Sequence, residues 1–128
     1  MKLLLDTHLL LWALVTPERL PSDVVAKLED NDNVPHFSAA SIAETAIKQT
    51  LQRPDFQVDV RLFLSHLLDS GFVEMPIKAE HAAFLGNLPM IHKDPFDRLL
   101  VAQANVEGVL LLTSDRLVAA YPGPIRLV

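Results

Sequence analysis

Short apolar runs that alternate with longer amphipathic stretches are the feature that most constrains how this chain can fold. Residues 3–5 and 109–112 are continuously apolar, which is typical of parallel strands buried on both faces. The runs of strand length predict strands at residues 2–5, 34–37, 72–75, 109–112 and 125–127. A parallel sheet of about five strands is therefore expected.

The stretches between these runs carry apolar residues at helical spacing, as at Ala43, Ala46, Ile47 and Leu51. We expect helices at about residues 7–15, 22–30, 41–51, 58–68, 78–85 and 97–106. Strands that alternate with helices imply right-handed crossovers and a parallel sheet with helices on both faces. Since 128 residues suffice for one domain but not two, we predict a single three-layer α/β/α sandwich over residues 1–128.

The composition excludes several kinds of protein and site. The chain has no cysteine for a disulfide, a thiolate zinc site or an iron–sulfur cluster, and its four scattered glycines form no Gly-rich phosphate-binding loop. A net charge of −5 argues against a generic basic nucleic-acid binder, but not against an enzyme whose acids gather in one metal site. Asp6 and His8 interrupt the apolar residues 1–15, which are too short to span a membrane, so we expect a cytoplasmic protein.

Acidic residues follow or lie close to the ends of the predicted strands. Asp6 directly follows the first strand, and Asp115 follows the fourth after Thr113 and Ser114. Glu44 lies in the helix after the second strand, and Asp97 lies at the start of the helix after the loop at 88–95. Because ligands bind beyond the carboxyl ends of the strands in open parallel sheets, we expect these four acids to line one pocket.

Helix capping is the alternative explanation for each acid taken alone. Ser41 and Glu44 have the spacing of a capping box, and Asp94 before Pro95 has the sequence of an N-cap, with Asp97 then in the first turn. Asp6 and Asp115 can likewise cap the helices that follow them. Capping does not explain why several acids gather at one edge, where their repulsion costs free energy unless a cation neutralises it.

A pocket of carboxylates without cysteine or histidine selects a hard cation, Mg²⁺ or Mn²⁺. Asp94 is a weaker candidate ligand beside the four acids, and the hydroxyls of Thr7, Thr113 and Ser114 can orient the acids or act as local caps. The five histidines show no metal-binding spacing and are interpreted as structural or solvated.

Basic residues near the acids have two interpretations. Lys48 lies four residues after Glu44, which favours an ordinary ion pair within a helix. Four other basic residues flank the acidic edge and either contact RNA phosphates or serve only solubility: Arg53, Lys93, Arg98 and Arg116.

Four segments carry a resemblance to a known family. The segments LLLDTHLLLW, SAASIAETAIK, LPMIHKDPFDRLLVAQA and LLTSDRLVAAY resemble the PIN-domain ribonucleases, with the nearest similarity to the VapC-like toxins of type II toxin–antitoxin pairs. The similarity covers nearly the whole chain and keeps the order of the motifs. One departure is Ala43, where similar sequences often carry a larger residue before the glutamate.

The resemblance implies an endoribonuclease that depends on Mg²⁺ or Mn²⁺ and leaves 5′-phosphate and 3′-hydroxyl ends. It also implies a homodimer and inhibition by a cognate antitoxin. The four acids of the family fall on Asp6, Glu44, Asp97 and Asp115. By this similarity Asp6 and Asp97 are the direct metal ligands, and Glu44 and Asp115 complete the acidic pocket.

Two other functions remain open at this point. The first is a metal-dependent phosphatase or phosphotransfer domain on a similar sheet, although the D-x-D-x-T pattern of one such class would need an acid where His8 stands. The second is a non-catalytic module that binds a partner and whose acids are only caps and solvated charge. Phosphate release from a small phosphoester would favour the first, and unchanged function in acid-to-amide variants would favour the second.

Overall fold

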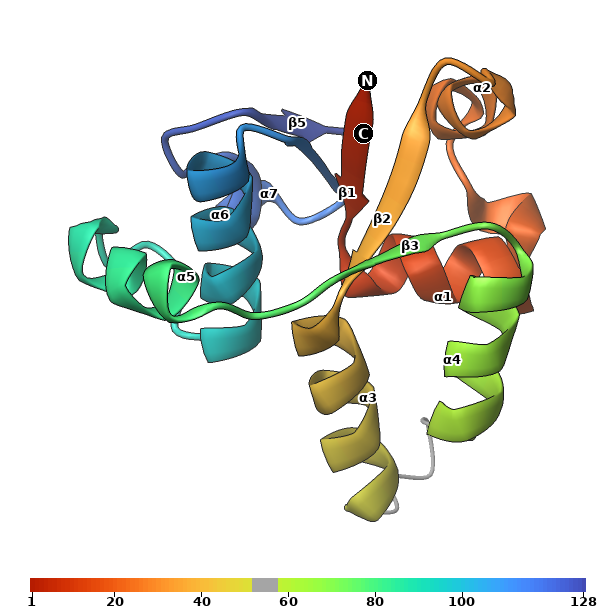
Figure 1. Cartoon of the computed structure of the whole chain (residues 1–128), viewed down its shortest axis with the longest axis horizontal. Coiled ribbons are helices and arrows are strands. Elements are labelled where there is room, and N and C mark those ends of the chain that lie inside the picture. The colour runs from red at the N-terminus through yellow and green to blue at the C-terminus, as the bar shows by residue number, and fades with distance from the viewer. Residues whose placement is uncertain (52–57) are drawn as a thin grey trace.

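The computed structural model describes residues 1–51 and 58–128, and these residues contain a five-stranded sheet in the order β3-β2-β1-β4-β5 (Figure 1). Every pairing between neighbouring strands is parallel. The strands are β1 (Lys2–Leu5), β2 (Val34–Ser38), β3 (Val73–Met75), β4 (Leu110–Thr113) and β5 (Ile125–Leu127). They confirm the five predicted strands, with ends that differ by a residue at most.

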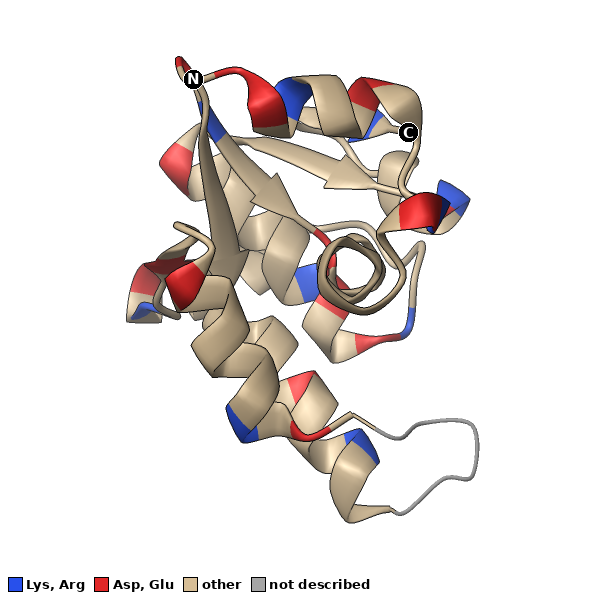
Figure 2. Ribbon diagram, turned by 90° about the vertical axis from the view of Figure 1, so that its right-hand side faces the viewer, with Lys and Arg blue, Asp and Glu red and all other residues tan. Residues whose placement is uncertain are grey.

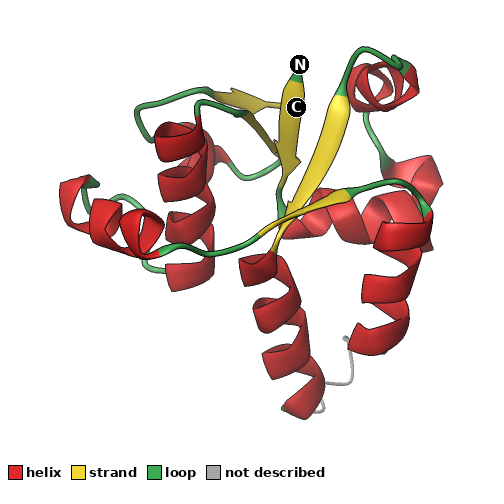
Figure 3. Cartoon of the chain, viewed as in Figure 1, coloured by secondary structure: helices red, strands yellow, loops and turns green. Residues whose placement is uncertain are grey.

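The helices alternate with the strands as expected (Figure 3). They are α1 (Thr7–Val15), α2 (Ser22–Glu29), α3 (Ala39–Thr50), α4 (Val60–Asp69), α5 (Ala79–Phe84), α6 (Pro95–Glu107) and α7 (Arg116–Ala119). The short α7 was not predicted, because four residues are too few to show a helical period. Within the described ranges, no helix has the length and apolar character that crossing a membrane requires.

The prediction of a capping box at Ser41 and Glu44 is wrong. Helix α3 begins earlier, at Ala39, because the side chain of Ser38 accepts a hydrogen bond from the backbone N–H of Ala40 and acts as the N-cap. Glu44 therefore lies beyond the first turn of α3. Its carboxylate is free for contacts outside the helix terminus.

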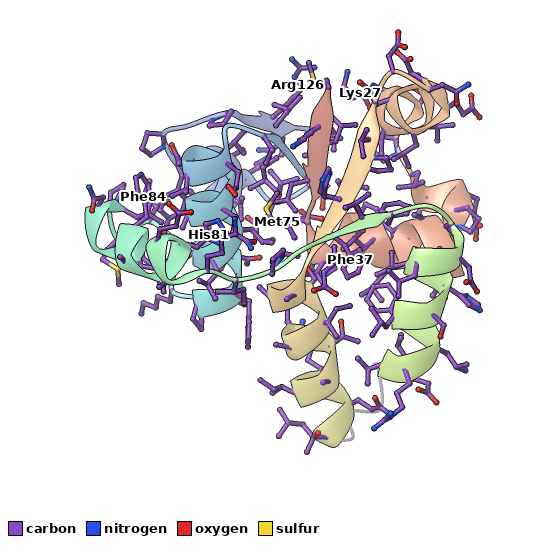
Figure 4. The ribbon with its side chains drawn as sticks, in the orientation of Figure 1. Lys27, Phe37, Met75, His81, Phe84 and Arg126 are labelled. Atoms are coloured by element: carbon purple, nitrogen blue, oxygen red, sulfur yellow. The ribbon has the colours of Figure 1, made fainter. Side chains whose placement is uncertain are left out.

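Two apolar clusters, one on each face of the sheet, confirm the three-layer sandwich. On β1, Leu4 belongs to the cluster that includes residues of α6 and α7, whereas Leu3 and Leu5 belong to the cluster with α1 and α4. This alternation follows from the two-residue period of a strand. Figure 4 shows Met75 on the α6 side of the sheet and Phe37 on the α4 side.

The register of the sheet places the ends of β1 and β4 side by side. Leu5 lies opposite Leu112, and the backbone N–H of Asp6 donates to the carbonyl of Leu112 at 3.0 Å. Asp6 and Thr113 therefore leave the sheet as neighbours. In Figure 2 acidic segments, coloured red, gather around these strand ends beside α1, which is seen end-on.

Candidate functional site

Asp6 is buried and uses both carboxylate oxygens. Its Oδ1 accepts a hydrogen bond from the N–H of Leu9 at 2.9 Å and so caps α1, as predicted. Its Oδ2 accepts from the Thr113 hydroxyl at 2.6 Å and from the Ser114 N–H at 3.0 Å. Burial raises the pKa of Asp6 above its usual range, although these hydrogen bonds act in the opposite direction.

Glu44 joins α3 to the start of α1. The Thr7 hydroxyl lies within hydrogen-bond distance of Glu44 Oε1, at 2.8 Å, and of the Ser41 hydroxyl, at 2.9 Å. The other carboxylate oxygen, Oε2, accepts from Lys48 Nζ at 2.9 Å, which confirms the predicted ion pair. Thr7 and Lys48 thus hold the buried Glu44 carboxylate in one orientation.

His92 lies between two of the predicted acids. Its Nε2 is 3.1 Å from Asp97 Oδ2 and 3.2 Å from Asp115 Oδ2. Sequence reasoning missed this residue, because Asp115 comes from a different part of the chain and histidine spacing gives no sign of such a contact. Asp115 also caps α7 by accepting from the Leu117 N–H at 2.8 Å, so capping and clustering coexist.

The carboxyl group of Asp97 lies in an environment that disfavours its charge. Burial and the nearby carboxylates of Asp94, Glu44 and Asp115 raise the pKa of Asp97 to about 7, while His92 opposes this shift. Glu44 of α3 is thus one of the carboxylates whose negative charge disfavours ionisation of Asp97 at the start of α6.

Contacts and repulsions connect all four predicted acids. The N–H of Asp115 donates to the same Thr113 hydroxyl that binds Asp6, at 3.0 Å. Thr113 thus links Asp6 to Asp115, and His92 links Asp115 to Asp97. Glu44 is held by Thr7, which directly follows Asp6. These contacts bring segments that carry the acids together beside the carboxyl ends of β1 and β4.

The other residues singled out in the sequence have different positions. Asp94 caps α6, accepting from the N–H groups of Phe96 and Asp97 at 2.8 and 3.3 Å. Lys93 and Arg116 are exposed next to the acids in the chain, whereas the guanidinium of Arg98 is engaged in contacts within the protein. Arg53 lies outside the described residues.

The donor groups of the site fit a divalent cation. Among the described residues, carboxylate oxygens of Asp97 and Asp115 lie with His92 Nε2 in a group whose ligand atoms are all within 4.8 Å of one another. A cation bound there would relieve the cost of burying several carboxylates together. The histidine nitrogen departs from the predicted pocket of carboxylates alone, whereas the carboxylate oxygens suit Mg²⁺ or Mn²⁺.

The raised pKa values predict how the stability of the metal-free protein depends on pH. Between about pH 4 and pH 7 native Asp97 binds more protons than unfolded Asp97, so the free energy of unfolding falls as the pH rises. The contribution reaches about 1.4 kcal/mol per pH unit. In urea unfolding, the free energy of unfolding of the Asp97→Asn variant should fall less steeply with rising pH than that of wild type. The Asp69→Asn variant, which changes an exposed acid of α4, should show the same fall as wild type. Equal slopes for all three proteins would contradict the environment described for Asp97.

Several solved structures share this fold. A VapBC2 structure from Rickettsia felis, bound to a DNA fragment from its promoter, has a chain with 18% identity and a TM-score of 0.76, covering 100% of this chain and 99% of that chain. A DNA-bound VapBC structure from Salmonella typhimurium has a chain with 16% identity and a TM-score of 0.66, covering 100% of this chain and 97% of that chain. A structure of FitAcB from Neisseria gonorrhoeae has a chain with 19% identity and a TM-score of 0.55, covering 91% of this chain and 89% of that chain.

These identities are low, so the similarity to solved structures establishes the fold. No curated protein sequence matches the chain. The family model for the PIN domain matches residues 3–123, which include Asp6, Glu44, Asp97 and Asp115. The chain therefore belongs to the PIN-domain family.

Proposed function

We propose that this protein is a divalent-metal-dependent endoribonuclease and the toxin of a VapBC-type toxin–antitoxin pair. The observation that carries the proposal is that Thr113 and His92 connect Asp6, Asp115 and Asp97, three acids from separate parts of the chain. The fourth acid, Glu44, is held by Thr7, which directly follows Asp6. Membership of the PIN-domain family supports nuclease chemistry at these residues.

Asp6 and Asp97 are the proposed direct ligands of Mg²⁺ or Mn²⁺, with Glu44 and Asp115 as supporting acids. A bound ion supplies Lewis-acid activation of water and neutralises charge that develops on the phosphodiester in the transition state. Thr113 and Ser114 orient the Asp6 carboxylate, and Thr7 with Lys48 orients that of Glu44. The raised pKa of Asp97, about 7, means that a cation held there would compete with a proton for its carboxylate.

RNA is the proposed substrate, and its phosphates are expected to contact basic residues around the acids. Lys93 and Arg116, which are exposed, are candidates. Arg53 remains a candidate because of its position in the sequence. Arg98 is a poorer candidate, because its guanidinium donates to Pro89, Leu85 and Tyr121. Hydrolysis adds water across the P–O3′ bond and leaves one 5′-phosphate and one 3′-hydroxyl end.

A cognate antitoxin and a second copy of the chain are the proposed protein partners, in the cytoplasm. The support is the fold shared with chains from VapBC structures of two bacteria. An acidic pocket also favours a basic segment of a partner, since complementary charge selects among partners. We expect the antitoxin to be a small DNA-binding protein that is encoded by a short neighbouring gene and copurifies with this chain.

Cleavage of RNA by the purified protein tests the proposal directly. We expect internal cuts in a single-stranded RNA with millimolar Mn²⁺ or Mg²⁺, 5′-phosphate product ends, and no cuts when EDTA is present. A chromogenic small phosphoester serves as the comparison substrate. Release of phosphate from that phosphoester without any cut in RNA would instead support a phosphatase, and inactivity on both substrates in the presence of metal would support a binding module.

A further inference from the structure

We propose that His92 is a positioning residue that holds Asp97 and Asp115 together for the cation, and that Tyr121 and Arg98 clamp His92 in place. This inference rests on the proposed function, because it concerns the same acids. It assigns a role to three residues, of which the four-acid pattern includes none.

Tyr121 holds the backbone of His92 at two points. The Tyr121 hydroxyl accepts a hydrogen bond from the His92 N–H at 2.8 Å and donates to the His92 carbonyl at 3.2 Å. Tyr121 is 4% exposed and packs in the apolar cluster with α6 and α7. The loop that carries His92 is therefore fixed to a buried aromatic ring 29 positions later in the chain.

Arg98 completes the clamp from the first turns of α6. Its Nη1 donates to the Tyr121 hydroxyl at 3.0 Å and to the carbonyl of Pro89 at 2.9 Å, and its Nη2 donates to the carbonyl of Leu85 at 3.3 Å. With this contact the Tyr121 hydroxyl accepts two hydrogen bonds and donates one, which uses its full capacity. Arg98 thereby ties the chain before His92, at Leu85 and Pro89, to the helix that carries Asp97.

The imidazole of His92 is oriented as a donor to the acids. Its Nδ1 accepts a hydrogen bond from the Asp94 N–H at 3.2 Å, so in the neutral ring the proton is on Nε2. Its Nε2 forms a hydrogen bond with Asp115 Oδ2 at 3.2 Å, and Asp97 Oδ2 lies 3.1 Å from the same nitrogen. This nitrogen keeps two carboxylates, from α6 and from the N-cap of α7, close together despite their repulsion. Residues that orient metal ligands in this way typically alter affinity 10- to 100-fold when removed.

Mn²⁺ affinity measured by calorimetry on the whole chain tests this role. We expect Tyr121→Phe, which removes only the hydroxyl, to weaken Mn²⁺ binding about 10-fold and His92→Leu to weaken it 10- to 100-fold. His92→Gln, which keeps an N–H donor at a similar reach, should bind within about 3-fold of wild type. Val24→Ala, a destabilising change at a buried position of α2, is the matched control and should leave the affinity unchanged.

Two results would overturn the proposal. Wild-type affinity in both Tyr121→Phe and His92→Leu would leave the clamp with a purely structural role. Equal weakening by His92→Gln and His92→Leu would show that the imidazole nitrogen itself binds the metal, instead of orienting the acids.

A metal-free measurement separates this proposal from the proposed function. Long-range proton–nitrogen NMR spectra of wild type should show that the neutral His92 ring is the Nε2–H tautomer. In Tyr121→Phe, the spectra should show that His92 no longer has one preferred tautomer. If wild type binds no Mn²⁺, the proposed function fails, and the spectra still decide whether the clamp orients His92. The Nδ1–H tautomer in wild type would overturn the clamp on its own.

Discussion

Replacing Asp97 by asparagine is expected to lower the rate of RNA cleavage on the order of 1,000-fold while the protein stays folded. Asparagine removes the negative charge that we propose binds the cation, but it keeps a carbonyl oxygen beside His92 Nε2. The helix start is unaffected, because Asp94 caps α6. Cleavage rates at saturating Mn²⁺, together with circular dichroism, measure both parts of this expectation.

Asp6→Asn should lower cleavage to a similar extent but also lower stability. Asp6 accepts hydrogen bonds at both carboxylate oxygens, from Leu9 on one and from Thr113 and Ser114 on the other. An asparagine amide offers one acceptor oxygen and one NH2 group, so at least one of these donors would face the NH2 group instead of an acceptor. Asp97→Asn is therefore the cleaner test of chemistry.

The matched control for both variants is Asp69→Asn, which removes an exposed carboxylate at the end of α4 and should cleave RNA as wild type does. A folded Asp97→Asn protein that cleaves RNA at the wild-type rate with EDTA present would refute a metal site built on these acids.

Mn²⁺ is expected to raise the melting temperature of the wild-type protein by about 10 °C at 100 times its dissociation constant. A ligand that binds only the native state adds about 2.7 kcal/mol at that concentration. The physical source of this gain is the cost of burying the acids, which is evident in the raised pKa values of Asp6 and Asp97. A bound cation would offset this cost by attracting the carboxylates.

Thermal unfolding followed by circular dichroism, with and without Mn²⁺, measures the shift. The Asp97→Asn variant should show a much smaller shift, because one proposed ligand is gone, and Asp69→Asn should show the wild-type shift. An unchanged melting temperature of wild type at millimolar Mn²⁺ would argue strongly against the site, whatever the outcome of the cleavage assay.

Local sequence patterns predicted the features that depend on neighbours in the chain. Continuous apolar runs located the strands, since a parallel strand buried on both faces needs apolar residues throughout. Helical spacing located the helices long enough to show a period, and the caps at Asp6, Asp94 and Asp115 follow from residue type next to a helix start. The resemblance of four segments to PIN domains is confirmed by the family match over residues 3–123.

Contacts between distant segments were decided only by the tertiary structure. Thr113 binds Asp6 across 107 positions, and this contact exists because β1 and β4 are neighbours in register. Ser38, rather than Ser41, caps α3, so the Glu44 carboxylate is available to accept a hydrogen bond from Thr7. The roles proposed for His92 and Arg98 likewise depend on contacts with Tyr121, which follows α7 in the chain. Periodicity and residue type report on the local chain, whereas a site assembled from several strand ends exists only once the sheet has brought them together.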